Sequence, residues 1–248
     1  MQQSYAERYA AFEENHWWFR ARRVILQRLL RSEIEWRPGM QVFEIGVGPG
    51  LNLYSLYPSN CEVQGLEPDA ENALLANRRG QIPVSVGTIE AMPAELRERS
   101  YDVITMFDVL EHIEDDCAAV ETVKKLLRPG GYFVLTVPAY EWLWSQHDDV
   151  NHHFRRYTRK RLLAPMERAG FAIQRATYFN TLLLPTVAAA RLLQRVLPRR
   201  DKEISDFDRS SGGLDKLLFQ IFSSEAWWLR RSSFPSGVSL FAIGRKPF

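Results

Sequence analysis

The sequence predicts an α/β fold in which a mostly parallel sheet is covered by helices on both faces. Apolar and β-branched runs of strand length, as at residues 41–45 and 101–107, alternate with longer segments whose apolar residues recur at helical spacing. Alternation of this kind builds parallel, doubly wound sheets. The first run ends at three glycines, Gly46, Gly48 and Gly50, in the turn where open α/β sheets bind nucleotide-like ligands.

The composition is that of an ordinary globular chain and argues against several classes of protein. The chain has 248 residues, 46% of them hydrophobic, and its formal net charge of +2 does not indicate a nucleic-acid partner. Cys61 and Cys117 have neither a metal-binding nor a redox spacing, and the first residues lack the apolar core of a signal peptide. No apolar run approaches the roughly 20 residues that span a bilayer. We therefore expect a cytoplasmic protein with reduced thiols.

The segment before the first strand is predicted to be helical over residues 4–33. Apolar residues recur at helical spacing on both sides of the aromatic and cationic stretch 16–23. This helix either packs its tryptophans on the sheet and exposes its arginines, or forms a lid whose arginine pairs with a ligand carboxylate.

The next elements follow from apolar runs and the residues that interrupt them. Pro58, the Pro-Gly-Gly run 129–131 and Gly170 end three of the helices. In chain order, we predict a strand at 41–45, a helix at 51–56, a strand at 61–67, a helix at 71–79, a strand at 83–87, a strand at 101–107, a helix from 115 or 116 to 127, a strand at 132–138, a helix at 158–169 and a strand at 171–178.

The glycine loop indicates which ligand it binds. A dinucleotide fingerprint needs a small residue at position 51, where Leu51 stands, and no phosphate-binding Gly-Lys-Ser/Thr follows. The loop therefore suits a nucleoside without a pyrophosphate, such as S-adenosylmethionine (SAM). Residues 43–50, Phe-Glu-Ile-Gly-Val-Gly-Pro-Gly, resemble the first motif of class I SAM-dependent methyltransferases.

The resemblance extends over roughly residues 16–175 and implies a seven-stranded, Rossmann-like methyltransferase fold. The family's antiparallel last strand then falls at 238–244, and residues 180–237 become a helical insertion. We accordingly expect an N-terminal helical lid over 1–36, a SAM-binding core over 37–179, the insertion, and a final core strand within 238–248.

The resemblance also implies the cofactor site. Glu67 ends the second strand about twenty residues after the first glycine, where a carboxylate accepts hydrogen bonds from the ribose hydroxyls. Residues 87–93 resemble the segment around the adenine, but Thr88 stands where an acid is common. Residues 108–113 resemble the motif that meets the methionine portion of SAM. The expected SAM-binding residues are Arg22, Glu44, Gly46, Gly48, Gly50, Glu67, Pro68, Thr88, Ile89, Phe107, Asp108 and His112, with S-adenosylhomocysteine as the product.

The acceptor is expected at residues 140–157, which hold three of the five histidines. Relatives of this type share an Asp followed by His-x-Arg-Arg-Tyr, which corresponds in this sequence to Asp148, His153, Arg155, Arg156 and Tyr157. Because a His–carboxylate pair can remove a hydroxyl proton near neutral pH, this pattern favours methylation at oxygen. The predicted catalytic residues are His153, Asp148 and Tyr157, and the predicted substrate-binding residues are His16, Trp18, His152, Arg155 and Arg156.

Three other interpretations of this loop stay open. It forms a salt-bridged scaffold, its arginine pair grips an anionic group of the substrate, or its histidines and acids bind a metal. No compact ligand spacing on a helix supports the last interpretation, so no metal is expected.

The insertion is predicted to contain amphipathic helices at 185–196 and 214–231 around a polar link at 198–213. Its second helix carries Trp227 and Trp228 beside Arg230 and Arg231. These helices either pack on the core or in a dimer, or they cap a hydrophobic, lipid-linked substrate taken from a membrane surface.

The sequence therefore predicts a SAM-dependent methyltransferase that acts at oxygen on a small, hydrophobic or lipid- or glycan-linked acceptor. Methylation of carbon or nitrogen in a secondary metabolite, and a non-catalytic SAM-binding or partner-binding role, are the alternatives. A nicotinamide-dependent oxidoreductase is disfavoured by Leu51. The expected partners are a small molecule and no nucleic acid, with peripheral membrane contact through 180–237 at the inner face. The expected state is a monomer or homodimer.

Overall fold

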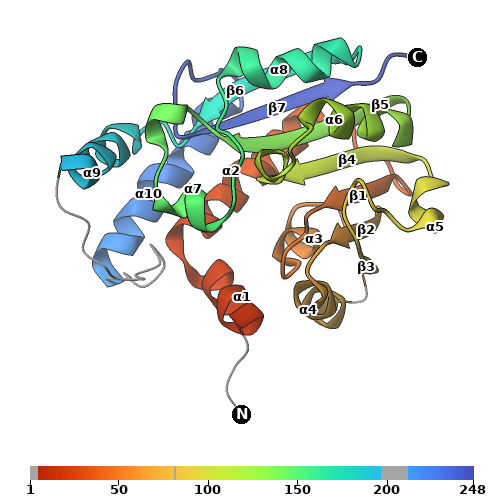
Figure 1. Ribbon diagram of the computed structural model, residues 1–248, viewed down its shortest axis with the longest axis horizontal. Coiled ribbons are helices and arrows are strands. Elements are labelled where there is room, and N and C mark those ends of the chain that lie inside the picture. Colours follow the sequence, from red (N-terminus) through yellow and green to blue (C-terminus); the bar gives the residue numbers. More distant parts are fainter. Residues whose placement is uncertain (1–4, 81, 197–211) are drawn as a thin grey trace.

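A single seven-stranded sheet forms the centre of the molecule (Figure 1). The computed structural model describes residues 5–80, 82–196 and 212–248. The strand order is β3-β2-β1-β4-β5-β7-β6. The strands are β1 (Gln41–Ile45), β2 (Glu62–Glu67), β3 (Val84–Val86), β4 (Tyr101–Phe107), β5 (Leu127–Pro138), β6 (Ala172–Phe179) and β7 (Ser239–Arg245).

Strands β1 to β5 are parallel, and β7 pairs antiparallel to both β5 and β6. The predicted doubly wound, mostly parallel sheet with an antiparallel last strand is thus confirmed. The helices are α1 (Tyr5–Asn15), α2 (Trp17–Glu33), α3 (Leu51–Ser55), α4 (Ala70–Gly80), α5 (Ala94–Arg97), α6 (Asp116–Leu126), α7 (Gln146–Val150), α8 (Arg159–Arg168), α9 (Leu184–Val196) and α10 (Gly212–Leu229). Two 3-10 turns, η1 (Leu110–His112) and η2 (Glu141–Leu143), complete the elements.

The segment predicted to be helical over residues 4–33 contains two helices, α1 and α2, because the chain breaks at His16. This residue is extended, with φ −68° and ψ 134°, and its side chain caps α2 by accepting a hydrogen bond from the N–H of Trp18. The cap satisfies one of the donors that a helix start leaves unpaired. Apolar residues recur at helical spacing on both sides of His16, so the sequence pattern gave no sign of the break between the two helices.

Strand β5 also begins earlier than predicted. Leu127 already pairs with Tyr101 of β4, and the register shifts before Tyr132 pairs with Val103. The Pro-Gly-Gly run therefore lies inside an irregular strand instead of ending a helix. Helices α5 and α7 were not predicted, because four or five residues are too few to show a helical period. Helix α3 is as short as α7, but it was predicted from its position between the glycine loop and Pro58. Most of the predicted polar link, residues 198–213, lies outside the described residues.

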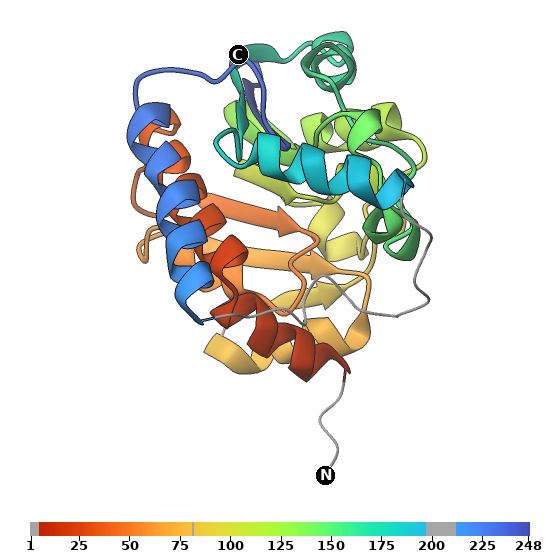
Figure 2. The same ribbon diagram turned by 90° about the vertical axis from the view of Figure 1, so that its left-hand side faces the viewer.

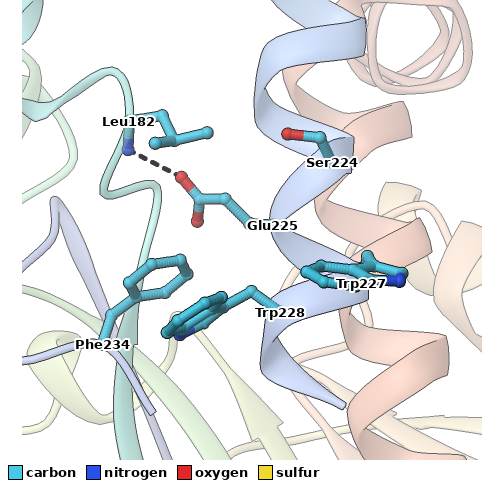
Figure 3. A pocket seen from close by; sticks show the side chains of 6 residues that line it. All are labelled: Leu182, Ser224, Glu225, Trp227, Trp228 and Phe234. Atoms are coloured by element: carbon cyan, nitrogen blue, oxygen red, sulfur yellow. Dashed lines mark hydrogen bonds between the residues drawn. The ribbon is translucent and has the colours of Figure 1, made fainter. Parts of the chain in front are cut away.

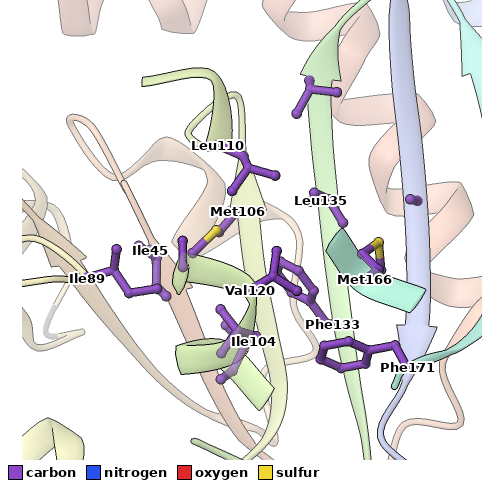
Figure 4. Packing of buried hydrophobic residues seen from close by; sticks show 14 of the residues in the cluster. Ile45, Ile89, Ile104, Met106, Leu110, Val120, Phe133, Leu135, Met166 and Phe171 are labelled. Carbon is purple, nitrogen blue, oxygen red and sulfur yellow. The ribbon is translucent and has the colours of Figure 1, made fainter. Parts of the chain in front are cut away.

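Two apolar clusters cover the faces of the sheet. On one face Phe133 of β5, Val120 of α6 and Met166 of α8 meet (Figure 4). On the other face α2 packs against the sheet, and Phe222 of α10 joins the same cluster. Figure 2 shows α10, in blue, running along α2, in red. The second helix of the predicted insertion, α10, is therefore packed into the core, on the same face of the sheet as α2.

The loops that bear the predicted site leave one edge of the sheet. Strands β1, β4 and β5 are parallel neighbours, so the segments that follow their carboxyl ends lie together. Strand β7 lies between β5 and β6 and is antiparallel to both, so β6 runs in the same direction as β5. The residues after Phe179 therefore leave this edge as well.

Helix α9 differs from the other long helices in its packing. No side chain from Leu184 to Gln194 is buried. Among the helices of the described ranges, none is both long enough and apolar enough to pass through a bilayer.

Candidate active site

The glycine loop after β1 has a backbone conformation that residues with a Cβ rarely adopt. Gly46, Gly48 and Gly50 all have positive φ, at +74°, +54° and +87°. A Cβ on Gly46 would overlap the side chain of Val109, so the loop and the segment after β4 are in close contact there. A Cβ on Gly48 would meet no atom within 4 Å. The backbone at Gly48 therefore borders open space, which a ligand can approach closely.

Glu67 ties the end of β2 to this loop. Its Oε2 accepts a hydrogen bond from the N–H of Gly48 at 2.8 Å, and its Oε1 accepts one from the N–H of Asp69 at 3.1 Å. Burial raises the pKa of Glu67 above its usual value, and these two hydrogen bonds act in the opposite direction. A carboxylate fixed beside an open glycine loop fits the ribose of a nucleoside, while Pro68 beyond it is exposed.

Arg22 of α2 reaches the carboxyl ends of β4 and β5. Its guanidinium pairs with Asp108 at 2.7 Å and donates to the hydroxyl of Thr136 at 2.8 Å. The same group lies over the rings of Trp18 and Phe107, at 5.4 and 5.9 Å from their centroids. Its buried Nε has no hydrogen-bond partner within the part of the chain that the structure describes. An unpaired buried donor is costly, and a carboxylate such as that of SAM would satisfy it.

The remaining predicted cofactor residues have different surroundings. Ile89 is buried, whereas Thr88 is exposed and its hydroxyl accepts a hydrogen bond from the N–H of Ala91. Thr88 therefore orders the turn. Glu44 is fully buried, where Tyr57 donates to it at 2.6 Å and Asn52 donates at 3.3 Å. Burial raises the pKa of Glu44 to about 7.

Asp148 organises the loop that follows β5. It is fully buried and accepts hydrogen bonds from the N–H of Ser145, from Nδ1 of His153 at 2.9 Å, and from two nitrogens of Arg156 at 2.8 and 2.9 Å. Burial acts to raise the pKa of Asp148, but the hydrogen bonds from His153 and Arg156 outweigh it and hold this pKa well below its usual range.

The ionised state of Asp148 fixes the orientation of His153. A carboxylate can only accept hydrogen bonds, so Nδ1 of His153 carries the hydrogen. In the neutral ring the lone pair is then on Nε2, which is the nitrogen that can accept a proton or bind a ligand.

His153 lies beside two residues of η1. The ring of His112 is perpendicular to that of His153, with 4.5 Å between the centroids. A carboxylate oxygen of Glu111 and one ring nitrogen of each histidine lie within 4.8 Å of one another. Partial burial, and then the proximity of His153, lower the pKa of His112 to about 4. Glu111, His112 and His153, which we call the Glu–His–His cluster, are the residues of this site that can hold a metal.

Sequence reasoning missed Glu111. It is fully buried, and in the described part of the chain neither of its carboxylate oxygens has a hydrogen-bond partner. Its signal in the sequence is an acid inside an otherwise apolar turn, between Leu110 and Ile113. Burial raises the pKa of Glu111 well above its usual range, and the nearby Asp108 adds to this.

Several predicted acceptor residues are engaged elsewhere. Tyr157 is fully buried, and its hydroxyl donates to Asp116 at 3.0 Å. Arg155 pairs with the same carboxylate at 3.1 Å, and Arg156 is neutralised by Asp148. The arginine pair is thus occupied by internal carboxylates. His152 is exposed with φ +54°, and the ring of His16 lies against that of Phe12, tilted by 33°, with 4.5 Å between the ring centroids.

Comparisons with known proteins agree with this geometry. A family model described as a methyltransferase domain matches residues 15–176. A probable S-adenosylmethionine-dependent methyltransferase of Mycolicibacterium smegmatis is 30% identical over 166 residues, which are 65% of this chain and 62% of that protein. The ubiquinone biosynthesis O-methyltransferase of Proteus mirabilis is 34% identical over 112 residues, 43% of this chain and 45% of that one. The chain thus spans about half the length of the curated relatives it matches.

Solved structures share the fold at low sequence identity. The complex of the Haloferax volcanii Trm112 methyltransferase activator with a putative methyltransferase matches with a TM-score of 0.62 and 18% identity, over 98% of this chain and 95% of that one. A geranyl diphosphate methyltransferase in complex with SAM matches with a TM-score of 0.59 and 14% identity, over 90% of this chain and 85% of that one. At these identities the likeness concerns the fold alone.

Proposed function

This chain belongs to the class I SAM-dependent methyltransferases, in the methyltransferase-domain family, and we propose that it methylates an oxygen atom of a small, hydrophobic or lipid-linked acceptor. The supporting observation is the hydrogen-bonded series Arg156–Asp148–His153 at the sheet edge that carries the glycine loop. Arg156 keeps Asp148 ionised, and Asp148 keeps Nε2 of His153 available. The name of the Proteus mirabilis relative, an O-methyltransferase, also supports oxygen.

The residues of the site have separate tasks in this proposal. Glu67 and the glycine loop would hold the nucleoside of SAM, and Arg22 would meet its carboxylate. When bound, SAM supplies a methyl group on a positively charged sulfur. His153 would accept the proton of the acceptor hydroxyl, so that an oxygen with a full lone pair faces the methyl group at about 3–3.5 Å.

Replacement of His153 tests this role. We expect His153→Asn to lower turnover by a factor of about 100 or more, since general-base catalysis contributes about 10²–10⁴. SAM affinity, measured by calorimetry, should stay within about threefold, because His153 is not among the residues proposed to bind SAM. Transfer of tritium from methyl-labelled SAM to a panel of hydroxylated, aminated and carbon-nucleophile lipids gives the turnover. His147→Asn in the same loop is the matched control.

The outcomes of this experiment separate the alternatives. Label on amines or carbon alone would reject the oxygen acceptor, and unchanged turnover in His153→Asn would reject the base. SAM binding without transfer to any compound in the panel would favour a non-catalytic role.

The proposed acceptor class depends on the surface of α10. An open hollow of about 440 Å³ lies between α10 and the segment after β6, and it is lined by Leu182, Ser224, Glu225, Trp227, Trp228 and Phe234 (Figure 3). Glu225 accepts a hydrogen bond from the N–H of Leu182 at 2.8 Å, which holds the segment against the helix. Apart from this carboxylate and one hydroxyl, the lining side chains are apolar, as a hydrocarbon chain requires.

The hollow is linked to the acceptor loop. Tyr140, at the start of that loop, shares a hydrogen bond with the hydroxyl of Ser236 at 3.1 Å and stacks on Tyr178 of β6. Tyr178 forms a β-bridge with Phe234, which lines the hollow. An apolar chain in the hollow would therefore lie beside residues that are in direct contact with the loop of His153.

The same region exposes much apolar surface. In the described ranges, half of the large apolar side chains that are exposed belong to residues 182–228, namely Leu182, Leu192, Leu193, Leu214, Leu217, Trp227 and Trp228. Trp227 is 71% exposed. Arg230 and Arg231, which are also exposed, follow after the buried Leu229. Tryptophan beside arginine is typical of proteins that bind the interface of anionic membranes. We include peripheral membrane contact through this region in the proposal.

Vesicle sedimentation tests the membrane contact. The protein should pellet with phosphatidylglycerol vesicles and much less with phosphatidylcholine vesicles, because the arginines add electrostatic attraction. Trp227→Ser/Trp228→Ser should weaken pelleting by about tenfold or more, whereas Leu74→Ser on α4, 49% exposed, should not. Equal pelleting of both variants would reject the contact, and dimer formation that the tryptophan variant abolishes would assign the surface to a homodimer.

A further inference from the structure

The hollow beside α10 contains a charged group that a purely apolar chain would not use. This group is the carboxylate of Glu225, a residue that is only 1% exposed. Its Oε1 accepts hydrogen bonds from the N–H of Thr181 at 2.7 Å and from the N–H of Leu182 at 2.8 Å. Its buried Oε2 has no hydrogen-bond partner among the residues that the structure describes.

Support of the turn at residues 181–182 does not account for the charge of Glu225. The carbonyl oxygen of a glutamine would accept the same two hydrogen bonds without a buried negative charge. An unpaired carboxylate oxygen away from water is costly unless a donor or a cation completes it. Burial accordingly raises the pKa of Glu225 above its usual value. A positively charged ligand would therefore supply what the second oxygen lacks.

Aromatic rings lie beside this oxygen. Figure 3 shows Oε2 of Glu225 directed toward the side chains of Phe234 and Trp228. The rings of these two residues are stacked, with 6.0 Å between their centroids and 22° between their planes. The face of an aromatic ring attracts a cation, and the attraction is stronger where water is excluded. A carboxylate beside two rings is thus a favourable environment for an ammonium group.

The other groups of the hollow leave this task to Glu225. The hydroxyl of Ser224 is engaged within α10, because it donates to the carbonyl of Ile221 at 2.7 Å. The hollow has a volume of about 440 Å³, which is enough for an alkyl chain next to the carboxylate. Because Oε2 is covered, a ligand reaches it only after a ring turns aside. Trp228 is 47% exposed and has room to turn toward solvent.

We propose that the hollow binds the acceptor through a primary ammonium group on its apolar chain, and that this group donates a hydrogen bond to Oε2 of Glu225 and lies against Phe234 and Trp228. The inference deepens the proposed function, since it adds a positive charge to the ligand of the hollow. It rests on that proposal for the apolar chain, but it does not depend on methyl transfer.

Calorimetric titration with simple amphiphiles, in the absence of SAM and at neutral pH, tests the site. The intact protein should bind n-octylammonium about tenfold or more tightly than n-octanol, because the charge adds a charge-assisted hydrogen bond and contacts with the rings. The affinity for n-octyltrimethylammonium should lie between these two, since that cation has no N–H to donate.

Replacement of Glu225 assigns this preference to its carboxylate. Glu225→Gln keeps an acceptor for the turn and removes the charge, so the affinities for n-octylammonium and n-octanol should come within about threefold of each other. Asp215→Asn, which changes the other acid of α10, is the matched control and should keep the preference. Should Glu225→Gln fail to fold, Trp228→Leu is the second variant, and it should narrow the preference by removing a ring.

The outcomes keep this inference distinguishable from the proposed function. Equal affinity of the wild type for n-octylammonium and n-octanol, or a preference that survives in Glu225→Gln, would overturn the ammonium site and leave the apolar hollow standing. Binding of neither compound would overturn both uses of the hollow, whereas the His153→Asn experiment decides methyl transfer separately. Pelleting with phosphatidylethanolamine vesicles that Glu225→Gln abolishes would assign the ammonium to a membrane lipid and overturn its assignment to the acceptor.

Discussion

The edge of the sheet that carries the glycine loop and the α9–α10 region are held in opposite ways. At the edge, polar groups are bound to one another: Glu67 to the backbone of Gly48, Arg22 to Asp108, and Asp148 to His153. In the other region, α9 buries none of its described side chains, and α10 exposes tryptophans beside its buried face. The first region is built to hold atoms in fixed positions, and the second to offer apolar surface.

The largest expected effect concerns Asp148. Asp148→Ala leaves Arg156 and His153 buried without their counter-charge, and removal of one partner from such a pair costs about 3–5 kcal/mol. Urea unfolding should show this loss, whereas Asp149→Ala, an exposed neighbour, should stay within about 0.5 kcal/mol. Equal stability of the two variants would mean that the edge is not held together by this carboxylate.

The second largest effect is expected from replacement of Glu67, and it concerns the binding of SAM. Glu67→Ala removes the carboxylate proposed to hold the ribose, and we expect SAM affinity to fall about 100-fold, or about 2.7 kcal/mol. Calorimetric titration measures this change. Glu71→Ala, in the first turn of α4, is the control for charge. A loss below about threefold for Glu67→Ala would remove this residue from the cofactor site.

Glu44 makes the stability of the protein depend on pH. Its folded-state pKa of about 7 lies above the ordinary value of 4.5, so the folded protein holds this proton more firmly than the unfolded chain. The contribution of Glu44 to stability is therefore fully present below about pH 4.5 and is lost as the pH rises to about 7.

Replacement of Glu44 isolates this contribution. Relative to wild type, Glu44→Gln should gain about 3 kcal/mol in free energy of unfolding between pH 4.5 and pH 8. Urea unfolding at both pH values measures the difference, and subtraction cancels other raised groups such as Glu13. A parallel pH dependence of the two proteins would contradict the buried, neutral carboxyl.

The smallest effect on stability is expected in α9. Leu192→Ser/Leu193→Ser changes side chains that are 56% and 57% exposed, so the free energy of unfolding should move by no more than about 0.5 kcal/mol. The same variant should lose part of its vesicle binding. A large loss of stability would show that α9 is packed in solution, and would weaken the contrast between the two regions.

The structural features that depend on residues close together in the sequence were predicted well. Strands β1 and β4 were predicted to the residue, because apolar runs bounded by turn residues define them locally. The glycine loop followed from spacing alone. Helix α10 was also predicted within two residues at each end, from its own periodicity.

Features that depend on tertiary contacts were not predicted. Nothing local marks the break at His16, the pairing of Arg22 with Asp108, or the role of Asp116 as the acceptor for Tyr157. Glu111 was overlooked for the same reason, since a carboxylate becomes unusual only when the fold buries it without a partner. The predicted pair of Asp148 and His153 lay close enough in sequence for a shared pattern to reveal it.

The position of β7 between β5 and β6 has a consequence for how the protein is made. Strand β6 joins the sheet only through β7, yet the ribosome synthesises β6 before α9, α10 and β7. While these later residues are still in the ribosome, β5 exposes an unpaired edge and β6 has no strand beside it. The sheet is therefore completed in one late step, when β7 inserts between β5 and β6. Until then the unpaired edge of β5 is open to pairing with strands of other chains.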